Sequence, residues 1–144
     1  MHHPRLPLGL LLAFFACLTL SGCGPATARL NGKVLLKGQP VPGAEIEFTP
    51  VNDATKNYRG ISLADGKYQI DYGQAGGLPL GNYRVTVTFY QTTDGKPLPP
   101  GELGESLKNT PKAVQLRYAL DLSVDRNTSA VDLNLDNAQL QPGG

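Results

Sequence analysis

The sequence predicts an all-β fold, a β-sandwich of seven short strands that follows a cleaved N-terminal signal. The first observation behind this prediction is an alternation of apolar and polar residues at a spacing of two, which recurs in seven separate stretches. The second is that turn-forming glycine, proline and aspartate residues separate these stretches at close intervals. The third is the lack of any convincing stretch with the apolar spacing of a helix. Together these patterns favour a sandwich.

The first two strands are predicted at residues 30–36 and 44–48, where apolar residues occupy alternate positions. Residues 37–43 between them form a turn, in which glycine allows a positive φ angle and the prolines prevent further ladder pairing. Gly43 is therefore assigned a structural role in this turn. We expect Phe48, at the apolar face of the second strand, to lie in the core.

The third and fourth strands are predicted at residues 58–63 and 67–72. Asp65 and Gly66 stand between them, and the Asp-Gly pair is a strong short-range signal for a tight hairpin. We assign both residues to this turn. A glycine-rich loop is expected at residues 73–81.

Three further strands are predicted at residues 83–89, 118–122 and 131–135, again from strict alternation. The segment 91–112 is rich in glycine and proline. So long a run without a regular element is uncommon inside a compact domain, and it indicates either a binding loop or a mobile segment. Residues 138–144 are expected to form a flexible tail.

The N-terminus is typical of a secretion signal. Arg5 is followed by an apolar run of 15 residues, 6–20, which is shorter than the roughly 20 residues of a membrane span but suits a signal-peptide core. Residues 20–23, Leu-Ser-Gly-Cys, resemble the lipobox of bacterial lipoproteins. The resemblance implies cleavage between Gly22 and Cys23 and a diacylglyceryl group on the Cys23 sulfur. An ordinary cleaved signal with a chance cysteine, or a short membrane anchor, is the alternative.

The chain is thus expected to comprise a signal peptide at residues 1–22, a lipidated tether at residues 23–28, one sandwich domain at residues 29–137 and the tail. The 122 residues that follow the signal (144 − 22) are enough for one domain with one core. The expected location is the cell envelope, where the lipid would hold the domain on a membrane, outer or cytoplasmic, on its periplasmic or surface side.

Composition excludes several functional classes. Both histidines and Cys17 lie in the signal, so the mature domain has no histidine, no tryptophan and no cysteine except Cys23. This removes Ser-His and Cys-His catalysis, His or Cys zinc sites and an intrachain disulfide, and we expect no cofactor. Twelve basic side chains balance twelve acidic ones after the signal, which gives no support for nucleic-acid binding.

Several segments resemble carboxypeptidase-regulatory-like domains, which are transthyretin-like sandwiches of seven strands. The resemblance rests on residues 30–34 and 38–48, on Ala-Asp-Gly-Lys-Tyr at 64–68 and on residues 80–87. The ending, residues 116–133, is similar to small lipoproteins of planctomycetes. The resemblance implies the fold and an accessory or binding role in the envelope, and it implies no reaction.

Tyr58-Arg59-Gly60 followed by Ser62 resembles the Tyr-Arg-Gly-Ser ending of 5-hydroxyisourate hydrolases, which are enzymes of transthyretin fold. In this chain an isoleucine interrupts the motif, the motif lies mid-chain, and the histidines of those enzymes are missing. A strand edge with an exposed arginine is the favoured interpretation.

Acidic residues are weighed as metal or acid–base sites. Four aspartates recur near the last two strands, and oxygen ligands suit Ca²⁺, but no stretch has the dense Asp-x-Asp-x-Asp-Gly loop. We therefore predict no metal site and a solvated polar face. Two glutamates share a face of the second strand, where cross-strand ion pairing with Lys33 and Lys37 is favoured over acid–base chemistry. The acidic residues concerned are Glu45, Glu47, Asp121, Asp125, Asp132 and Asp136.

Tyr72 and Tyr90 are the candidate binding residues, because they stand at predicted strand ends beside the two long loops. Tyr83 and Tyr118 instead fit core positions by alternation. The predicted function is a lipid-anchored, non-enzymatic envelope protein with a binding or structural accessory role, whose partner would be an envelope protein or a glycan. The alternatives are a carbohydrate- or peptide-binding module that delivers ligand to a partner and, more remotely, an enzyme that uses Asp, Glu and Tyr.

Overall fold

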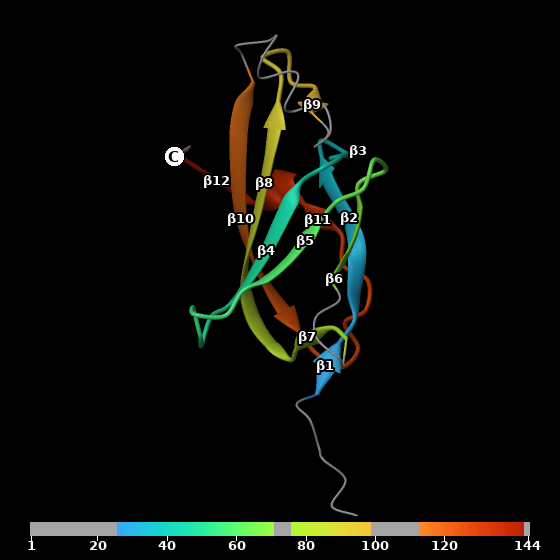
Figure 1. Cartoon of the computed structure of the whole chain (residues 1–144), viewed down its shortest axis with the longest axis vertical. Helices are drawn as coiled ribbons and strands as arrows, with labels where there is room; N and C mark the ends of the chain where they lie inside the picture. The colour runs from blue at the N-terminus through green and yellow to red at the C-terminus, as the bar shows by residue number, and fades with distance from the viewer. Residues whose placement is uncertain (1–25, 71–75, 99–112, 143–144) are drawn as a thin grey trace, which may run out of the picture.

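The computed structural model describes residues 26–70, 76–98 and 113–142, which form two main β-sheets packed face to face and one short two-stranded sheet (Figure 1). The large sheet has the order β12-β10-β8-β4-β5, and β9 also pairs with β8. Its antiparallel strands are β4 (Glu45–Pro50), β5 (Tyr58–Ile61), β8 (Gly81–Gln91), β9 (Pro97–Leu98), β10 (Val114–Val124) and β12 (Gln139–Gln141).

The small sheet is built around β2 (Leu30–Leu36). β6 (Lys67–Ile70) and β3 (Gln39–Pro40) pair with it in antiparallel fashion, and β11 (Leu133–Asn134) pairs with it in parallel. The elements that complete the fold are the short pair β1 (Thr27–Ala28) and β7 (Leu78–Pro79) and the 3₁₀ helix η1 (Leu135–Asn137).

The predicted all-β sandwich is confirmed. Each of the seven predicted strands has a counterpart, namely β2, β4, β5, β6, β8, β10 and β11. The last of these is shorter than predicted, because Leu135 begins η1 rather than continuing a strand. Among the described residues, no helix has the length and apolar character needed to cross a membrane.

The core lies between the inner faces of the two sheets. Phe48 is fully buried, as predicted, and its ring lies 6.4 Å from that of Tyr68 in the small sheet and 6.2 Å from that of Tyr83 in its own. Burial of each such side chain contributes about 1.5–3 kcal/mol. The other large buried side chains include Leu30, Val34, Ile46, Ile70, Leu78, Val85, Phe89, Leu133 and Leu135.

Both ends of the domain extend beyond the predicted boundaries. The predicted tether ends in β1, whose Ala28 is 6% exposed and belongs to the core. The predicted flexible tail is wrong for Gln139–Gln141, which forms β12 on the edge of β10. These strands are too short to show an alternation of their own, and pairing holds each of them in place, β12 on the long β10 and β1 on the equally short β7.

The predicted loop at residues 91–112 is also partly structured. Gln91 ends β8, and Pro97–Leu98 returns as β9 to pair with it. The remainder of that prediction, residues 99–112, lies outside the described residues. Figure 1 places β9 at the opposite end of the sandwich from β1 and β7.

The turn at Asp65 and Gly66 forms as predicted, but its two strands part into different sheets. The backbone N–H of Leu63 donates to the Lys67 carbonyl at 2.8 Å, and Gly66 has a φ of 76°. β5 then pairs with β4, whereas β6 pairs with β2. Gly60 permits their close approach, since a Cβ there would meet the Ile70 side chain at 2.5 Å.

Candidate functional site

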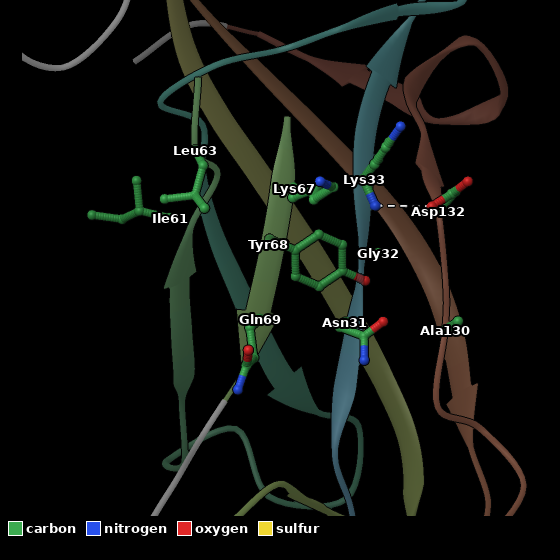
Figure 2. A pocket seen from close by; sticks show the side chains of 10 residues that line it. All are labelled: Asn31, Gly32, Lys33, Ile61, Leu63, Lys67, Tyr68, Gln69, Ala130 and Asp132. Carbon is green, nitrogen blue, oxygen red and sulfur yellow. Dashed lines mark hydrogen bonds between the residues drawn. The ribbon is translucent and has the colours of Figure 1, made fainter. Parts of the chain in front are cut away.

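A groove of about 610 Å³ runs over the outer face of the small sheet (Figure 2). Its floor is formed by β6 and β2, one side by the end of β5 and the turn after it, and the other by the segment that leads into β11. The lining residues are Asn31, Gly32, Lys33, Ile61, Leu63, Lys67, Tyr68, Gln69, Ala130 and Asp132.

Four polar side chains form a two-by-two array on this floor. Lys33 stands directly opposite Lys67 across the β2–β6 ladder, and Asn31 stands directly opposite Gln69. All four residues are exposed. The two pairs are two residues apart along the strands, and a strand rises about 3.4 Å per residue. The floor therefore presents two ammonium groups and two amides within one small area.

The β2 edge of the groove is closed by backbone pairing to the segment before β11. The Asp132 carboxylate accepts the backbone N–H of Lys33 at 2.8 Å, the contact drawn as a dashed line in Figure 2. The backbone N–H of Val131 donates to the Asn31 carbonyl at 2.8 Å, and that of Asn31 to the Ser129 carbonyl at 3.1 Å. These bonds attach the groove wall to β2.

Tyr68 anchors the groove from below. Its hydroxyl donates to the Val131 carbonyl at 2.7 Å, and burial, with a smaller effect of the nearby Asp132 carboxylate, raises the pKa of that hydroxyl far above its usual range. The ring reaches Val131 across Gly32, its ladder partner. A Cβ at Gly32 would lie 1.8 Å from the Val131 oxygen, so no other residue fits there without a backbone shift.

The two lysines of the array differ in how far neighbouring carboxylates neutralise their ammonium groups. Asp65 pairs with the Lys67 ammonium at 2.8 Å, which raises the pKa of Lys67 and lowers that of Asp65. Within the described part of the chain, no carboxylate forms an ion pair with the Lys33 ammonium. An ammonium group has three donors, so both lysines retain donors for a ligand.

An apolar ridge flanks the array on the β5 side. Ile61 is 57% exposed and Leu63 66% exposed, and Figure 2 shows both side chains at the end of β5 and the turn after it, to the left of β6. Because exposed large apolar residues that adjoin a groove are typical of contact surfaces, the ridge belongs to the candidate site.

The three turn residues assigned from sequence have the structural roles expected of them. Gly43, with a φ of 66°, donates its N–H to the Ser62 carbonyl at the start of β4. The Asp65 carboxylate accepts the Lys67 N–H at 3.1 Å, and Gly66 packs against Pro40 with no room for a Cβ.

Tyr90, one of the residues proposed for binding, is not among the residues that line the groove. Tyr90 is half-buried on β8, opposite Leu98 of β9, and so lies in the large sheet. Tyr72, Gly22 and Cys23 lie outside the described residues. Of the two tyrosines placed in the core, Tyr83 is buried, whereas Tyr118 is half-buried with its ring stacked on Phe89 at 6.1 Å.

The predicted cross-strand pairing of glutamate with lysine is wrong. β2 and β4 belong to different sheets, so Lys33 and Lys37 do not face β4. The Glu47 carboxylate instead pairs with Arg59 of β5 at 3.0 Å and accepts a hydrogen bond from the Asn57 amide.

The aspartates near the end of the chain have four separate structural partners. Asp121 pairs with Arg84 at 2.9 Å, and Asp125 closes its loop through Thr128 and Asn127, whose hydrogen bonds lower its pKa. Asp132 and Asp136 accept backbone N–H groups of β2 and of the residue after it, rather than forming only a solvated face. Within residues 26–70, 76–98 and 113–142, no three His, Cys, Asp or Glu side chains gather as metal ligands.

The motif that resembles the hydrolase ending also has structural roles. Tyr58 is buried with its ring edge against Tyr83, Arg59 pairs with Glu47, and Gly60 makes room for Ile70. The buried Ser62 hydroxyl donates to the Val41 carbonyl and accepts the Ala44 N–H. These contacts agree with the structural interpretation of the motif.

The groove itself has no clear signal in the sequence. Alternation places Asn31 and Lys33 on an outer face, and it does the same for Lys67 and Gln69. Only the register of β6 on β2 places the side chains of one strand opposite those of the other. That register depends on the divergence of β5 and β6 after a hairpin turn, which local patterns do not reveal.

Comparison with known proteins yields structural likeness alone. No family model matches the chain, and no curated protein is a significant match. Among solved structures, a proposed carbohydrate-binding protein of Pseudomonas aeruginosa is 12% identical, with 76% of this chain and 89% of that one covered at a TM-score of 0.47.

Two further solved structures are similar in the same general way. The major pilin subunit of Bacillus cereus is 19% identical, with 80% of this chain and 31% of that one covered at a TM-score of 0.48. The 5-hydroxyisourate hydrolase of Klebsiella pneumoniae is 15% identical, with 84% and 99% covered at a TM-score of 0.36. At these values no functional argument rests on the likeness.

Proposed function

We propose that this chain is a lipid-anchored, non-enzymatic domain of the bacterial cell envelope, where it acts as a binding or structural accessory. The Leu-Ser-Gly-Cys sequence at residues 20–23 supports the attachment, because its cysteine would carry the lipid. Acyl chains would then supply the membrane affinity, at about 0.8 kcal/mol per buried methylene.

One structural observation carries the proposal, namely that the domain begins almost immediately after Cys23. Thr27 and Ala28 already pair with β7, and Ala28 is buried. Three residues lie between Cys23 and Thr27 in the sequence, and an extended chain spans at most about 3.6 Å per residue. A lipid on Cys23 would therefore hold the β1 end of the sandwich close to the bilayer, with β9 at the far end (Figure 1).

The non-enzymatic part of the proposal is supported by how the polar side chains are engaged. The residues that resemble a hydrolase motif make contacts with other residues of the domain. The carboxylates of Glu47, Asp65 and Asp121 form ion pairs, and that of Asp132 accepts a backbone N–H group. In the described part of the chain, every buried polar side-chain atom has a hydrogen-bond partner.

Metabolic labelling with a fatty-acid analogue tests the attachment. Wild-type protein should incorporate the label and fractionate with membranes, whereas Cys23→Ser should do neither. Cys17→Ser is the matched control, because Cys17 precedes the cleavage site and should not affect labelling. Equal labelling of wild type and Cys23→Ser would contradict the proposal.

The groove favours a second candidate function, a carbohydrate- or peptide-binding module that delivers ligand to a partner. Its polar array and apolar ridge provide the hydrogen-bonding groups and the apolar surface that such ligands contact. A glycan array, probed with the lipoprotein in detergent, separates the candidates. Uniform lack of binding, together with pull-downs that enrich one envelope protein, would favour the accessory role.

A further inference from the structure

The outer face of the small sheet contains an arrangement that folding alone does not favour. Lys33 and Lys67 are direct cross-strand neighbours, and like charges in that position are destabilising. The backbone N–H of Lys33 points away from β6, to Asp132. Lys33 and Lys67 therefore form a pair without mutual hydrogen bonds, the type in which side chains lie closest.

Neighbouring carboxylates do not explain this pair. Asp65 neutralises part of the charge on Lys67, at 2.8 Å, but the Lys33 ammonium has no such partner among the described residues. The Asp132 carboxylate is held by the Lys33 backbone. An anion placed between the two ammonium groups would remove the repulsion and form charge-assisted hydrogen bonds with both.

The surroundings of the lysines restrict what kind of anion fits. The next ladder pair is Asn31 and Gln69, whose amides can each donate and accept hydrogen bonds. It lies about 7 Å along the strands, at about 3.4 Å per residue, and the array is thus comparable in size with one or two sugar rings. Ile61 and Leu63 supply an apolar surface beside it.

We propose that this groove binds a carboxylate-bearing sugar of the uronic-acid type. The carboxylate lies between the Lys33 and Lys67 ammonium groups, and the ring hydroxyls bond to the amides of Asn31 and Gln69. The apolar ridge contacts the C–H face of the sugar. This inference deepens the proposed function and rests on its binding role.

Isothermal titration calorimetry on the lipoprotein purified in detergent tests the proposal, with three probes at low ionic strength. Oligogalacturonate should bind. Its methyl ester, which keeps the sugar but loses the charge, should bind at least tenfold more weakly, and so should polyglutamate, which keeps the carboxylates but has no sugar. Equal affinity for either of the last two probes would overturn the assignment of an acidic sugar.

Substitutions locate the site. Lys33→Ala and Lys67→Ala should each weaken oligogalacturonate binding at least tenfold, whereas Lys96→Ala, in the turn before β9, should leave it unchanged. Wild-type affinity in both groove variants would overturn the site. Lys33→Ala should unfold at the same or a higher denaturant concentration than wild type, since it removes a like-charge pair, so lost binding cannot be ascribed to misfolding.

The outcomes also separate this inference from the proposed function. Binding of a neutral glycan that ignores both lysine substitutions would overturn the acidic-sugar site and leave a binding role in place. Absence of fatty-acid label would overturn the anchor and leave the groove chemistry intact.

Discussion

The Asp136 carboxylate accepts the backbone N–H of Lys37 with both oxygens, at 2.9 and 3.1 Å, across 99 residues of sequence. Lys37 is the first of two residues that connect β2 with β3, and it has a φ of 52°, followed by 72° at Gly38. Two positive φ angles are the pattern of a type I′ turn, which favours asparagine rather than lysine at its first position. The bond from Asp136 offsets the strain of this backbone.

Replacing the strained lysine should stabilise the fold. Lys37→Asn should raise the free energy of unfolding by roughly 0.5–1 kcal/mol, because asparagine tolerates the left-handed region. Asp136→Ala should lower it by about 1–2 kcal/mol, as loss of a carboxylate cap on a backbone N–H does elsewhere. Urea unfolding followed by far-UV circular dichroism measures both. Lys96→Asn is the control, since the backbone of Lys96 lies outside the left-handed region and gives asparagine no advantage, and an equal gain there would contradict the explanation.

Gly32→Ala should be among the most destabilising single-methyl changes in the chain. The new Cβ would overlap the Val131 carbonyl oxygen, which also accepts the Tyr68 hydroxyl. We expect a loss of roughly 1–3 kcal/mol, the usual cost of overpacking. Thermal unfolding compares it with Asn31→Ala at the neighbouring exposed position, which should change stability by less than about 0.5 kcal/mol. Similar values for the two variants would show that the segment at Val131 can move aside.

Phe48→Ala should remove the centre of the core. Phe48 is fully buried between the aromatic rings of Tyr68 and Tyr83, so truncation should cost about 3–5 kcal/mol. Val51→Ala, 67% exposed just after β4, is the control and should cost less than about 0.5 kcal/mol. Chemical denaturation measures both, and a loss below about 1 kcal/mol for Phe48→Ala would contradict the placement of Phe48 at the core.

The fold should lose stability in alkali through its buried tyrosines. Burial raises the pKa of Tyr83 from its ordinary 10.0 to about 12, with a smaller effect of Tyr58. The unfolded chain therefore releases this proton at lower pH than the folded one does. The contribution of Tyr83 to the free energy of unfolding is therefore fully present below about pH 10 and is lost as pH rises towards 12.

Unfolding midpoints in urea at pH 8 and pH 11 measure this effect in wild type and Tyr83→Phe. The variant should lose less stability between the two pH values, although Tyr68 keeps its own contribution. At pH 8 it should be less stable than wild type by about 0.5–1.5 kcal/mol, because its hydrogen bond to the Pro79 carbonyl is lost. Parallel pH dependence in both proteins would contradict the role of Tyr83.

Local signals account for most of the individual elements. Alternation predicts the strands around Phe48 and Tyr83 because those faces are buried, and Asp65-Gly66 predicts a turn that only a glycine conformation allows. The same signals fail for β1, β9 and β12, which have two or three residues each and are held by pairing, β9 and β12 to the long strands β8 and β10 and β1 to the equally short β7. They fail equally for the Asp136–Lys37 bond, which joins residues far apart in sequence.

Local patterns predict seven main strands with one apolar face each, and they make Cys23 the residue expected to carry a lipid. These patterns are a spacing of two and a short signal motif. The folded domain alone reveals that β5 and β6 part into separate sheets and that Lys33 faces Lys67. Strand register is set by burial and backbone pairing across the whole domain, so a residue on a paired strand that is distant in sequence leaves no local pattern.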